Sequence, residues 1–218
     1  MRLTKALISI NNKKATELDG SQLPLMESFY TIQGEGYHTG VASYFIRTAG
    51  CNVGCHWCDV KDSWDANAYP LVDVEQIAKK VAAHKMKIAV VTGGESFMFN
   101  MQPLTDALAK EGIQRHVETS GAYPFSGDWE WICLSPKKAK KPLEENLGKA
   151  QELKVVIYNQ SDFKWAEEFA ARVSKDCKLY MQPEWNKSYM MMPKIVDYIK
   201  EHPQWQISLQ THKYMNIP

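Results

Sequence analysis

Three closely spaced cysteines are the residues in this sequence best suited to metal chemistry. They are Cys51, Cys55 and Cys58, in the pattern Cys-x3-Cys-x2-Cys. Three thiolates at this spacing can ligate three corners of a metal or iron–sulfur site. No fourth cysteine lies near them in the sequence. One position of the site therefore stays open for another ligand, which is typical of catalytic rather than structural centres.

Zinc is the simplest alternative occupant, with His56 as its fourth ligand. Zinc motifs usually come as two separated ligand pairs, however, and His56 stands between two cysteines, where its ring would have difficulty reaching the same metal. Trp57, directly before Cys58, suits packing against a bulky ligand. These features favour an iron–sulfur cluster, and a non-enzymatic zinc or electron-transfer module remains the alternative.

The composition indicates one compact domain around these residues. The chain has 218 residues, of which 44% are hydrophobic and 23% are charged, enough for one substantial core. A net charge of +1 offers no electrostatic surface for nucleic acid or for an anionic membrane. No apolar run approaches the ~20 residues needed to span a bilayer. Five cysteines, an odd number, and an N-terminus without a secretory pattern indicate a protein of the reducing cytoplasm.

Strand and helix patterns that alternate from residue 42 onward predict an α/β fold with a mostly parallel sheet. The expected strands are 43–48, 88–92, 116–120, 131–135, 153–158, 179–182 and 206–211. Asp73 is suited to cap a helix that follows it. Further helices are expected around 104–108, over 162–173 and after Pro193, which would lie in a first helical turn. Residues 1–23 are left as an unassigned N-terminal arm, so the catalytic domain is expected over 24–218.

Polar or glycine-rich segments follow five of the expected strands. Ligands bind at the C-terminal ends of parallel strands, so these segments should meet in one site. The segments are the cysteine loop, Thr92-Gly93-Gly94-Glu95, Glu118-Thr119-Ser120-Gly121, Ser135-Pro136-Lys137 and Gln182-Pro183.

The cysteine spacing, with an aromatic residue before the last cysteine, resembles the radical S-adenosylmethionine (SAM) superfamily. The Gly93-Gly94-Glu95 run after the next strand is similar to the GGE motif of that superfamily. The resemblance implies an incomplete TIM-like βα barrel with a mostly parallel sheet. It also implies a 4Fe–4S cluster held by the three cysteines, with SAM bound to the fourth iron through its amino and carboxylate groups.

Further motifs resemble one family, the 7-carboxy-7-deazaguanine synthases of the 7-deazapurine (queuosine precursor) pathway. The motifs are Phe29-Tyr30-Thr31-Ile32-Gln33-Gly34-Glu35-Gly36, Phe45-Ile46-Arg47, Glu118-Thr119-Ser120-Gly121, Ser135-Pro136-Lys137 and residues 210–218. The resemblance implies a carbon–nitrogen lyase that converts 6-carboxy-5,6,7,8-tetrahydropterin to 7-carboxy-7-deazaguanine. A 5'-deoxyadenosyl radical would abstract hydrogen from the carbon bearing the carboxylate, the ring would contract with loss of ammonia, and SAM would be regenerated.

The resemblance also implies which residues bind SAM and which bind the substrate. The implied SAM-binding residues are Trp57, Asp59, Gly94, Glu95, Ser135, Pro136, Lys137, Gln182 and Pro183. The implied substrate-binding residues are Ile32, Gln33, Gly34, Glu35, Arg47, Thr92 and Pro218. The side chains fit such a substrate, because a flat heterocycle with a carboxylate needs amide or carboxylate partners for its ring edge and a cation for its acid. Gln33 and Glu35 can supply the first, and Arg47 the second. Lys137 opens a lysine run, which is usually a solvated face.

The chain departs from the family at Val60, where a serine or threonine proposed to coordinate magnesium is common, so Mg²⁺ binding is left open. Ser96 also replaces the proline that usually follows the GGE motif. The expected partners are the small pterin substrate, a reductant protein such as a flavodoxin, and a second copy in a homodimer. One alternative keeps the cluster and changes the substrate: an activase that installs a glycyl radical on a partner protein.

Overall fold

The computed structural model describes residues 18–218, so the first 17 residues of the expected N-terminal arm lie outside the described part. Within it, nine strands form one sheet in the order β3-β1-β2-β4-β5-β6-β7-β8-β9. The parallel strands are β2 (Ala42–Thr48), β4 (Ile88–Gly93), β5 (Gln114–Thr119), β6 (Trp131–Leu134), β7 (Glu152–Ile157), β8 (Lys178–Pro183) and β9 (Trp205–Ile207). Strand β1 (Gln22–Ile32) pairs antiparallel with β2 and with β3 (Leu71–Asp73). Because β3 and β9 do not pair, the sheet is an incomplete barrel, as expected.

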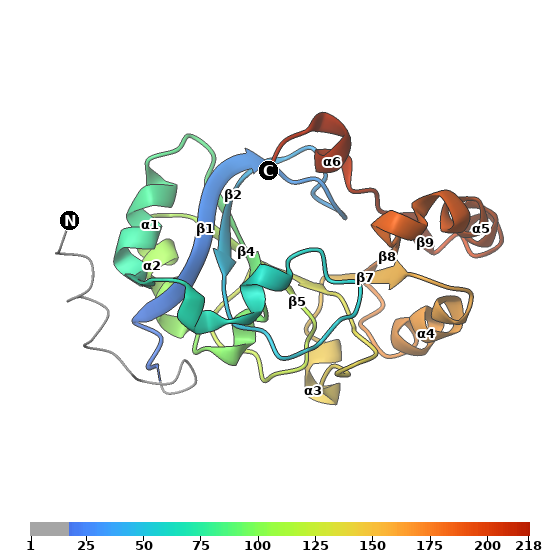
Figure 1. The fold of residues 1–218 in the computed structure, drawn as a ribbon, viewed down its shortest axis with the longest axis horizontal. Coiled ribbons are helices and arrows are strands. Elements are labelled where there is room, and N and C mark those ends of the chain that lie inside the picture. The colour runs from blue at the N-terminus through green and yellow to red at the C-terminus, as the bar shows by residue number, and fades with distance from the viewer. Residues whose placement is uncertain (1–17) are drawn as a thin grey trace.

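The longer helices lie outside the curved sheet (Figure 1). They are α1 (Val74–Ala82), α2 (Gln102–Lys110), α4 (Ser161–Ala170) and α5 (Ser188–Glu201). Two short helices, α3 (Glu144–Leu147) and α6 (Thr211–Met215), complete the set, and α6 lies beside the end of β1 (Figure 1). The Asp73 carboxylate accepts a hydrogen bond from the Glu75 amide at 3.0 Å, which confirms the expected helix cap.

Apolar side chains on the outer face of the sheet form two buried clusters. One lies under α1 and α2 and contains Ile77 and Leu104, and the other lies under α4 and α5 and contains Phe169 and Trp205. Each fully buried side chain of this size contributes about 1.5–3 kcal/mol. The inner face of the sheet is left free for polar side chains. Within residues 18–218, no helix combines the length and the apolarity needed to cross a bilayer.

Three sequence-based expectations need correction. Strand β1 was not foreseen: it contains Pro24 and an irregularity between Leu25 and Glu27, and most of its second half is only partly buried, so it lacks strict alternation. It begins at Gln22, two residues before the expected domain boundary. Pro193 lies inside α5 and not in its first turn. Proline at this position removes the hydrogen bond to the carbonyl of Tyr189, four positions earlier, and Tyr189 is 94% exposed.

The expected strand over 206–211 is also shorter than predicted. Strand β9 ends at Ile207, and Ser208 still bonds through its amide to the Met181 carbonyl. The chain then turns away from the sheet, and Thr211 begins α6. Gln210 and Thr211 bind the segment that follows β1, at the opposite end of the sheet, as described below.

Candidate active site

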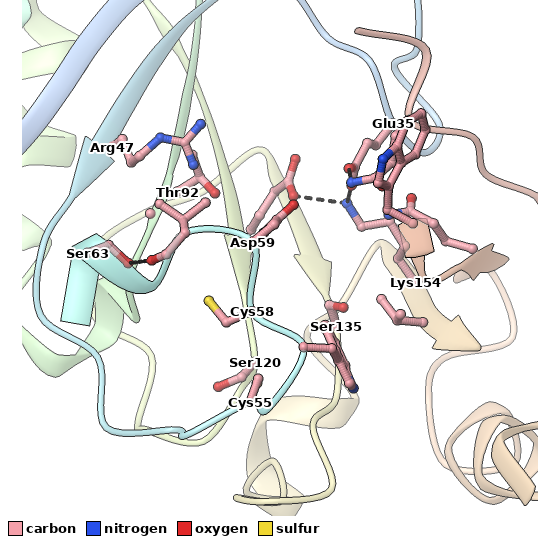
Figure 2. Close-up of a pocket in the computed structure, with 18 of the residues that line it drawn as sticks. Glu35, Arg47, Cys55, Cys58, Asp59, Ser63, Thr92, Ser120, Ser135 and Lys154 are labelled. Atoms are coloured by element: carbon pink, nitrogen blue, oxygen red, sulfur yellow. Dashed lines mark hydrogen bonds and ion pairs between the residues drawn. The ribbon is translucent and has the colours of Figure 1, made fainter. Parts of the chain in front are cut away.

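A cavity of about 500 Å³ opens at the C-terminal ends of the parallel strands. Every residue expected to bind the cluster, SAM or the substrate lines this cavity, with the exception of Pro136, which is buried. Figure 2 shows Arg47 and Thr92 on one side and Glu35 and Lys154 on the other, with Cys55 and Cys58 below them. The fold therefore brings together motifs that are up to about 180 residues apart in the sequence.

The cysteine loop leaves β2 and is held in place by its backbone. The Gly50 amide donates to the Ser63 carbonyl at 2.6 Å, and the Cys51 amide donates to the Trp64 carbonyl at 3.1 Å. Gly50 has a φ of +100°, a conformation that favours glycine. All three cysteines are half-buried free thiols. Burial raises the pKa of Cys55, and the nearby Lys137 ammonium acts in the opposite direction.

The donor set of the loop fits an iron–sulfur cluster. Thiolates are the ligands that such clusters use, and the three thiols line a wide cavity. Within residues 18–218, no three side chains from His, Cys, Asp and Glu are arranged to ligate one metal ion. His56 packs against Tyr158 with the ring centroids 4.9 Å apart.

The glycine motif after β4 is tied to the start of the cysteine loop. The Gly94 amide donates to the Thr48 carbonyl at 2.9 Å, and the Glu95 amide donates to the Gly50 carbonyl at 2.8 Å. A side chain at Gly94 would overlap the Gly50 carbonyl, so the close approach requires glycine. Backbone hydrogen bonds therefore join the glycine motif and the start of the cysteine loop into one unit.

The carboxylate of Glu95 is buried and connects two loops of the site. It accepts hydrogen bonds from the Thr119 hydroxyl at 2.6 Å, from the Ser120 amide at 2.9 Å and from the Ser120 hydroxyl. Ser96, which departs from the family pattern, is also buried, and its hydroxyl lies 3.4 Å from that of Thr48. The departure therefore adds a polar contact to the same unit.

Lys137 is not a solvated lysine. Its ammonium donates to the Ser135 carbonyl at 2.7 Å and to the Ser135 hydroxyl at 2.6 Å, and it lies 5.7 Å from the centroid of the Trp57 ring. Burial lowers the pKa of Lys137. The lysines that follow it are more open to solvent, and one of them, Lys140, donates to Asn52 in the cysteine loop at 3.1 Å. The start of the lysine run thus belongs to the cavity wall.

A cluster of acids and amides forms one wall of the cavity, and we call it the acid–amide wall. Its members are Gln33, Glu35, Glu118, Lys154 and Gln210. The Lys154 ammonium donates to Glu35 and, at 2.9 Å, to Glu118. Gln33 donates to Glu118 at 3.0 Å, and Gln210 donates to Glu35 at 2.8 Å. Burial would raise the pKa of Glu35, but the Lys154 charge and these donors lower it to about 2.

Arg47 on the opposite side of the cavity has a partner that the sequence did not suggest. Its Nε lies 2.6 Å from a carboxylate oxygen of Glu27, on the neighbouring strand β1. The guanidinium is 6.0 Å from the centroid of the Phe29 ring. No described residue accepts from its two terminal nitrogens, so these donors are left for a ligand.

Residues 210–218, which we call the tail, fold back over the cavity. The Thr211 amide and hydroxyl donate to the Gly34 carbonyl at 2.9 and 3.0 Å, and the Thr31 hydroxyl donates to the Pro218 carbonyl at 3.3 Å. Gln210, His212, Lys213 and Pro218 line the cavity. The tail therefore covers the site from the side of β1.

The position expected for a magnesium ligand carries no side-chain oxygen. Val60 lines the cavity, and its carbonyl accepts from the amide and hydroxyl of Ser63 at 3.1 and 2.6 Å. Asp59, the neighbouring residue with a carboxylate, lies 3.4 Å from the Lys213 ammonium of the tail.

Sequence analysis did not assign roles to Lys154, Glu118, Gln210 or Glu27. For Lys154 a signal was present: Glu152 and Lys154 are charged residues two positions apart in an otherwise apolar strand, so both face the same side of the sheet. For Glu27 there was none, because its strand was not foreseen.

Comparisons with known proteins agree with this site. A model of the radical SAM superfamily matches residues 45–154. The chain is 56% identical over 199 residues to a 7-carboxy-7-deazaguanine synthase from Flavobacterium psychrophilum, covering 91% of this chain and 94% of the relative. It is 43% identical over 202 residues to a synthase of the same name from Synechocystis sp., covering 93% and 97%. The crystal structure of QueE from Escherichia coli superposes with a TM-score of 0.77 at 28% identity, covering 91% of this chain and 99% of that one.

The open parallel sheet, the three cysteines at its rim and the superfamily match define a radical SAM enzyme. Membership of this superfamily implies a 4Fe–4S cluster and SAM as cofactors. The near full-length relatives are more specific, and the chain belongs to the 7-carboxy-7-deazaguanine synthase family.

Proposed function

We propose that the protein converts 6-carboxy-5,6,7,8-tetrahydropterin to 7-carboxy-7-deazaguanine, with loss of ammonia, in queuosine precursor biosynthesis. The observation that carries the proposal is the division of the cavity between the acid–amide wall and Arg47 (Figure 2). The pyrimidine edge of a pterin carries N–H donors, which suit the carboxylates of the wall. A carboxylate on the far end of the ring suits a guanidinium.

Arg47 is proposed to bind the substrate carboxylate through its terminal nitrogens. Glu27 holds Nε at 2.6 Å and so fixes the plane of the guanidinium, which favours a paired contact with a planar acid. Thr92, from the neighbouring strand β4, lines the same side and can add a hydroxyl contact. Gln33, Glu35 and the backbone of Ile32 and Gly34 would contact the ring.

The chain is proposed to hold both cofactors on the cysteine side of the cavity. Cys51, Cys55 and Cys58 would ligate the cluster, and residues of the cysteine loop, of the loops after β4 and β6, and of the end of β8 would bind SAM. Those residues are Trp57, Asp59, Gly94, Glu95, Ser135, Pro136, Lys137, Gln182 and Pro183. When bound, the cluster and SAM supply the hydrogen-atom abstraction, and the protein supplies position and shelter from water. The tail, with Pro218 at the cavity, would provide that shelter and contact the substrate.

Four further features are part of the proposal. Any Mg²⁺ would be held through substrate and water, since Val60 has no oxygen side chain and Asp59 is near Lys213. The reductant is proposed to be a small protein such as a flavodoxin. The enzyme is proposed to act as a homodimer in the cytoplasm, and the catalytic domain to run over residues 24–218.

Mass spectrometry of the product tests the proposed reaction. The cluster is reconstituted anaerobically, and the protein is supplied with SAM, a reductant and 6-carboxytetrahydropterin in buffer with magnesium. The expected product is lighter than the substrate by one ammonia, and a Cys51→Ala variant should form none. If 5'-deoxyadenosine accumulates while the pterin stays intact, the substrate is wrong and a glycyl-radical activase becomes the better explanation. A protein substrate would need an open groove, and the tail contacts argue against one.

A further inference from the structure

Lys154 is the most enclosed charged group of the acid–amide wall. Its side chain is 4% exposed, and those of its two partners, Glu35 and Glu118, are 15% and 22% exposed. It lies on β7, the third strand from the β9 edge of the sheet, and lines the cavity. None of the proposed cofactor or substrate contacts assigns it a role.

Lys154 connects segments that are distant in the sequence. Through Glu35 it holds the segment that follows β1, and through Glu118 it holds the end of β5. Glu35 also accepts from Gln210 of the tail, so the same ion pair supports the tail where it meets the cavity. The Lys154 ammonium thus connects β7 with the segment after β1 and the end of β5, and through Glu35 it also supports the tail.

The charge of Lys154 also determines what the two carboxylates can offer a ligand. Two buried carboxylates on one wall with no cation repel each other, and one of them takes up a proton. A protonated carboxyl presents an O–H donor where a ligand N–H needs an acceptor. With Lys154 in place, the pKa of Glu35 is lowered to about 2, against the effect of its burial. Burial would lower the pKa of Lys154, but Glu118 and Glu35 raise it well above its usual range.

We propose that Lys154 is a positioning residue that holds Glu35 and Glu118 in place as paired acceptors for the N–H edge of the substrate ring. The inference rests on the proposed function and deepens it, because it specifies the class of ring that fits: a 2-aminopyrimidinone, with adjacent N–H donors. An analogue with a 2-oxo group in place of the 2-amino group presents an acceptor to two anions. The site should reject that analogue.

Competitive binding of two stable analogues tests this selectivity. The probes are 6-carboxypterin and its 2-oxo counterpart, 6-carboxylumazine. The two compounds compete for the cluster-loaded, SAM-bound enzyme, and the ratio of their affinities is measured. The wild type should prefer the 2-amino compound by about tenfold or more, the worth of one hydrogen bond to a charged acceptor. In Lys154→Met, which keeps most of the length of the side chain and removes its charge, the preference should shrink to within about threefold. Lys154→Arg keeps the charge and should retain the larger part of the preference.

Kinetics and a double variant separate positioning from general damage. Lys154→Met should raise KM by about tenfold or more and change kcat much less, because the lost contacts hold the substrate and not the reacting carbon. Its cluster content should match the wild type. If Lys154 acts through the charge of Glu35, the double variant Lys154→Met/Glu35→Gln should be no worse than Glu35→Gln alone.

Two results would overturn the inference: unchanged KM and analogue preference in Lys154→Met, or fully additive losses in the double variant. Should Lys154→Met not fold, the double variant carries one fewer unpaired charge, and its comparison with Glu35→Gln still decides the question. The failure of the proposed function looks different. In that case the wild type would form no product from the pterin, while the analogue preference would still be measurable by binding.

Discussion

Substituting Gly34 by alanine should release the tail from the cavity. Gly34 does not have a positive φ, so alanine is compatible with its backbone. The added Cβ, however, would lie 2.8 Å from Cβ of His212, closer than carbon atoms approach in proteins. Since His212 Cβ is next to the backbone, a rotamer change cannot remove the overlap. The tail itself must move.

The cost of that movement can be bounded from the contacts. Overpacking by one methyl group costs about 1–3 kcal/mol. The tail can avoid the overlap by giving up its three hydrogen bonds to Gly34 and Glu35, worth about 1 kcal/mol each, or about 3 kcal/mol together. A cost of about 2 kcal/mol, in the middle of the range, raises the undocked population by about 30-fold.

Limited trypsin digestion reports this population directly. Lys213 contacts Asp59 and lies 4.7 Å from the centroid of the Trp185 ring in the docked tail, so cleavage after it requires undocking. When docking is fast relative to cleavage, the rate of cleavage follows the undocked population. Gly34→Ala should therefore lose peptide 214–218 about 30-fold faster, with a lower kcat/KM for the pterin.

Gly148→Ala is the matched control. Gly148 has no atom within 4 Å of an added Cβ and does not line the cavity, so its cleavage rate and activity should match the wild type. Equal cleavage rates and equal kcat/KM in Gly34→Ala and Gly148→Ala would refute the assignment of the tail as a cover held at Gly34.

Three further predictions concern the cluster, the loop carboxylate and acid stability. Cys51→Ala should lose the visible absorption of the reconstituted cluster, whereas Cys177→Ala, a buried cysteine outside the cavity, should keep it, and equal loss in both would contradict the ligand assignment. Glu95→Gln should lower the free energy of unfolding, measured by urea denaturation, by about 2 kcal/mol, because its buried carboxylate accepts four hydrogen bonds, one of them from the Phe97 amide, while the exposed Glu111→Gln should have little effect. Burial lowers the pKa of His116 from 6.5 to about 4, so the unfolded chain takes up a proton first and stability falls as pH drops through that window. The stability of His116→Gln should fall less than that of the wild type over the same pH window. An identical pH profile would show that His116 is not responsible.

The parallel part of the sheet could be predicted from the sequence because its strands are short apolar runs with clear boundaries. The cysteine loop and the glycine motif were identifiable because their chemistry depends on neighbours in the sequence. Strand β1 was missed because half of its length is partly exposed and its pattern is broken by Pro24 and the irregularity before Glu27. The last strand was expected over 206–211 but ends at Ile207, because Gln210 and Thr211 bind the segment after β1 and not a neighbouring strand.

The site showed the same division between local and long-range information. Which residues line the cavity followed from motifs at strand ends, and the structure brings all of them together except Pro136. Which of these residues pair with one another could not be predicted from the sequence, because Lys154 and its partner Glu35 are 119 positions apart. Likewise, the resemblance placed Lys137 among the SAM-binding residues, but its contact with Ser135 is seen only in the folded loop.

The central claim is that this cavity uses SAM as a cofactor to contract a carboxylated pterin ring. The most direct test counts molecules of 7-carboxy-7-deazaguanine formed for each SAM consumed, over a full anaerobic time course with the reconstituted enzyme. The account predicts many product molecules per SAM, with little 5'-deoxyadenosine. Consumption of SAM with no loss of pterin would contradict the proposed substrate, and one SAM consumed per product would contradict its role as a regenerated cofactor.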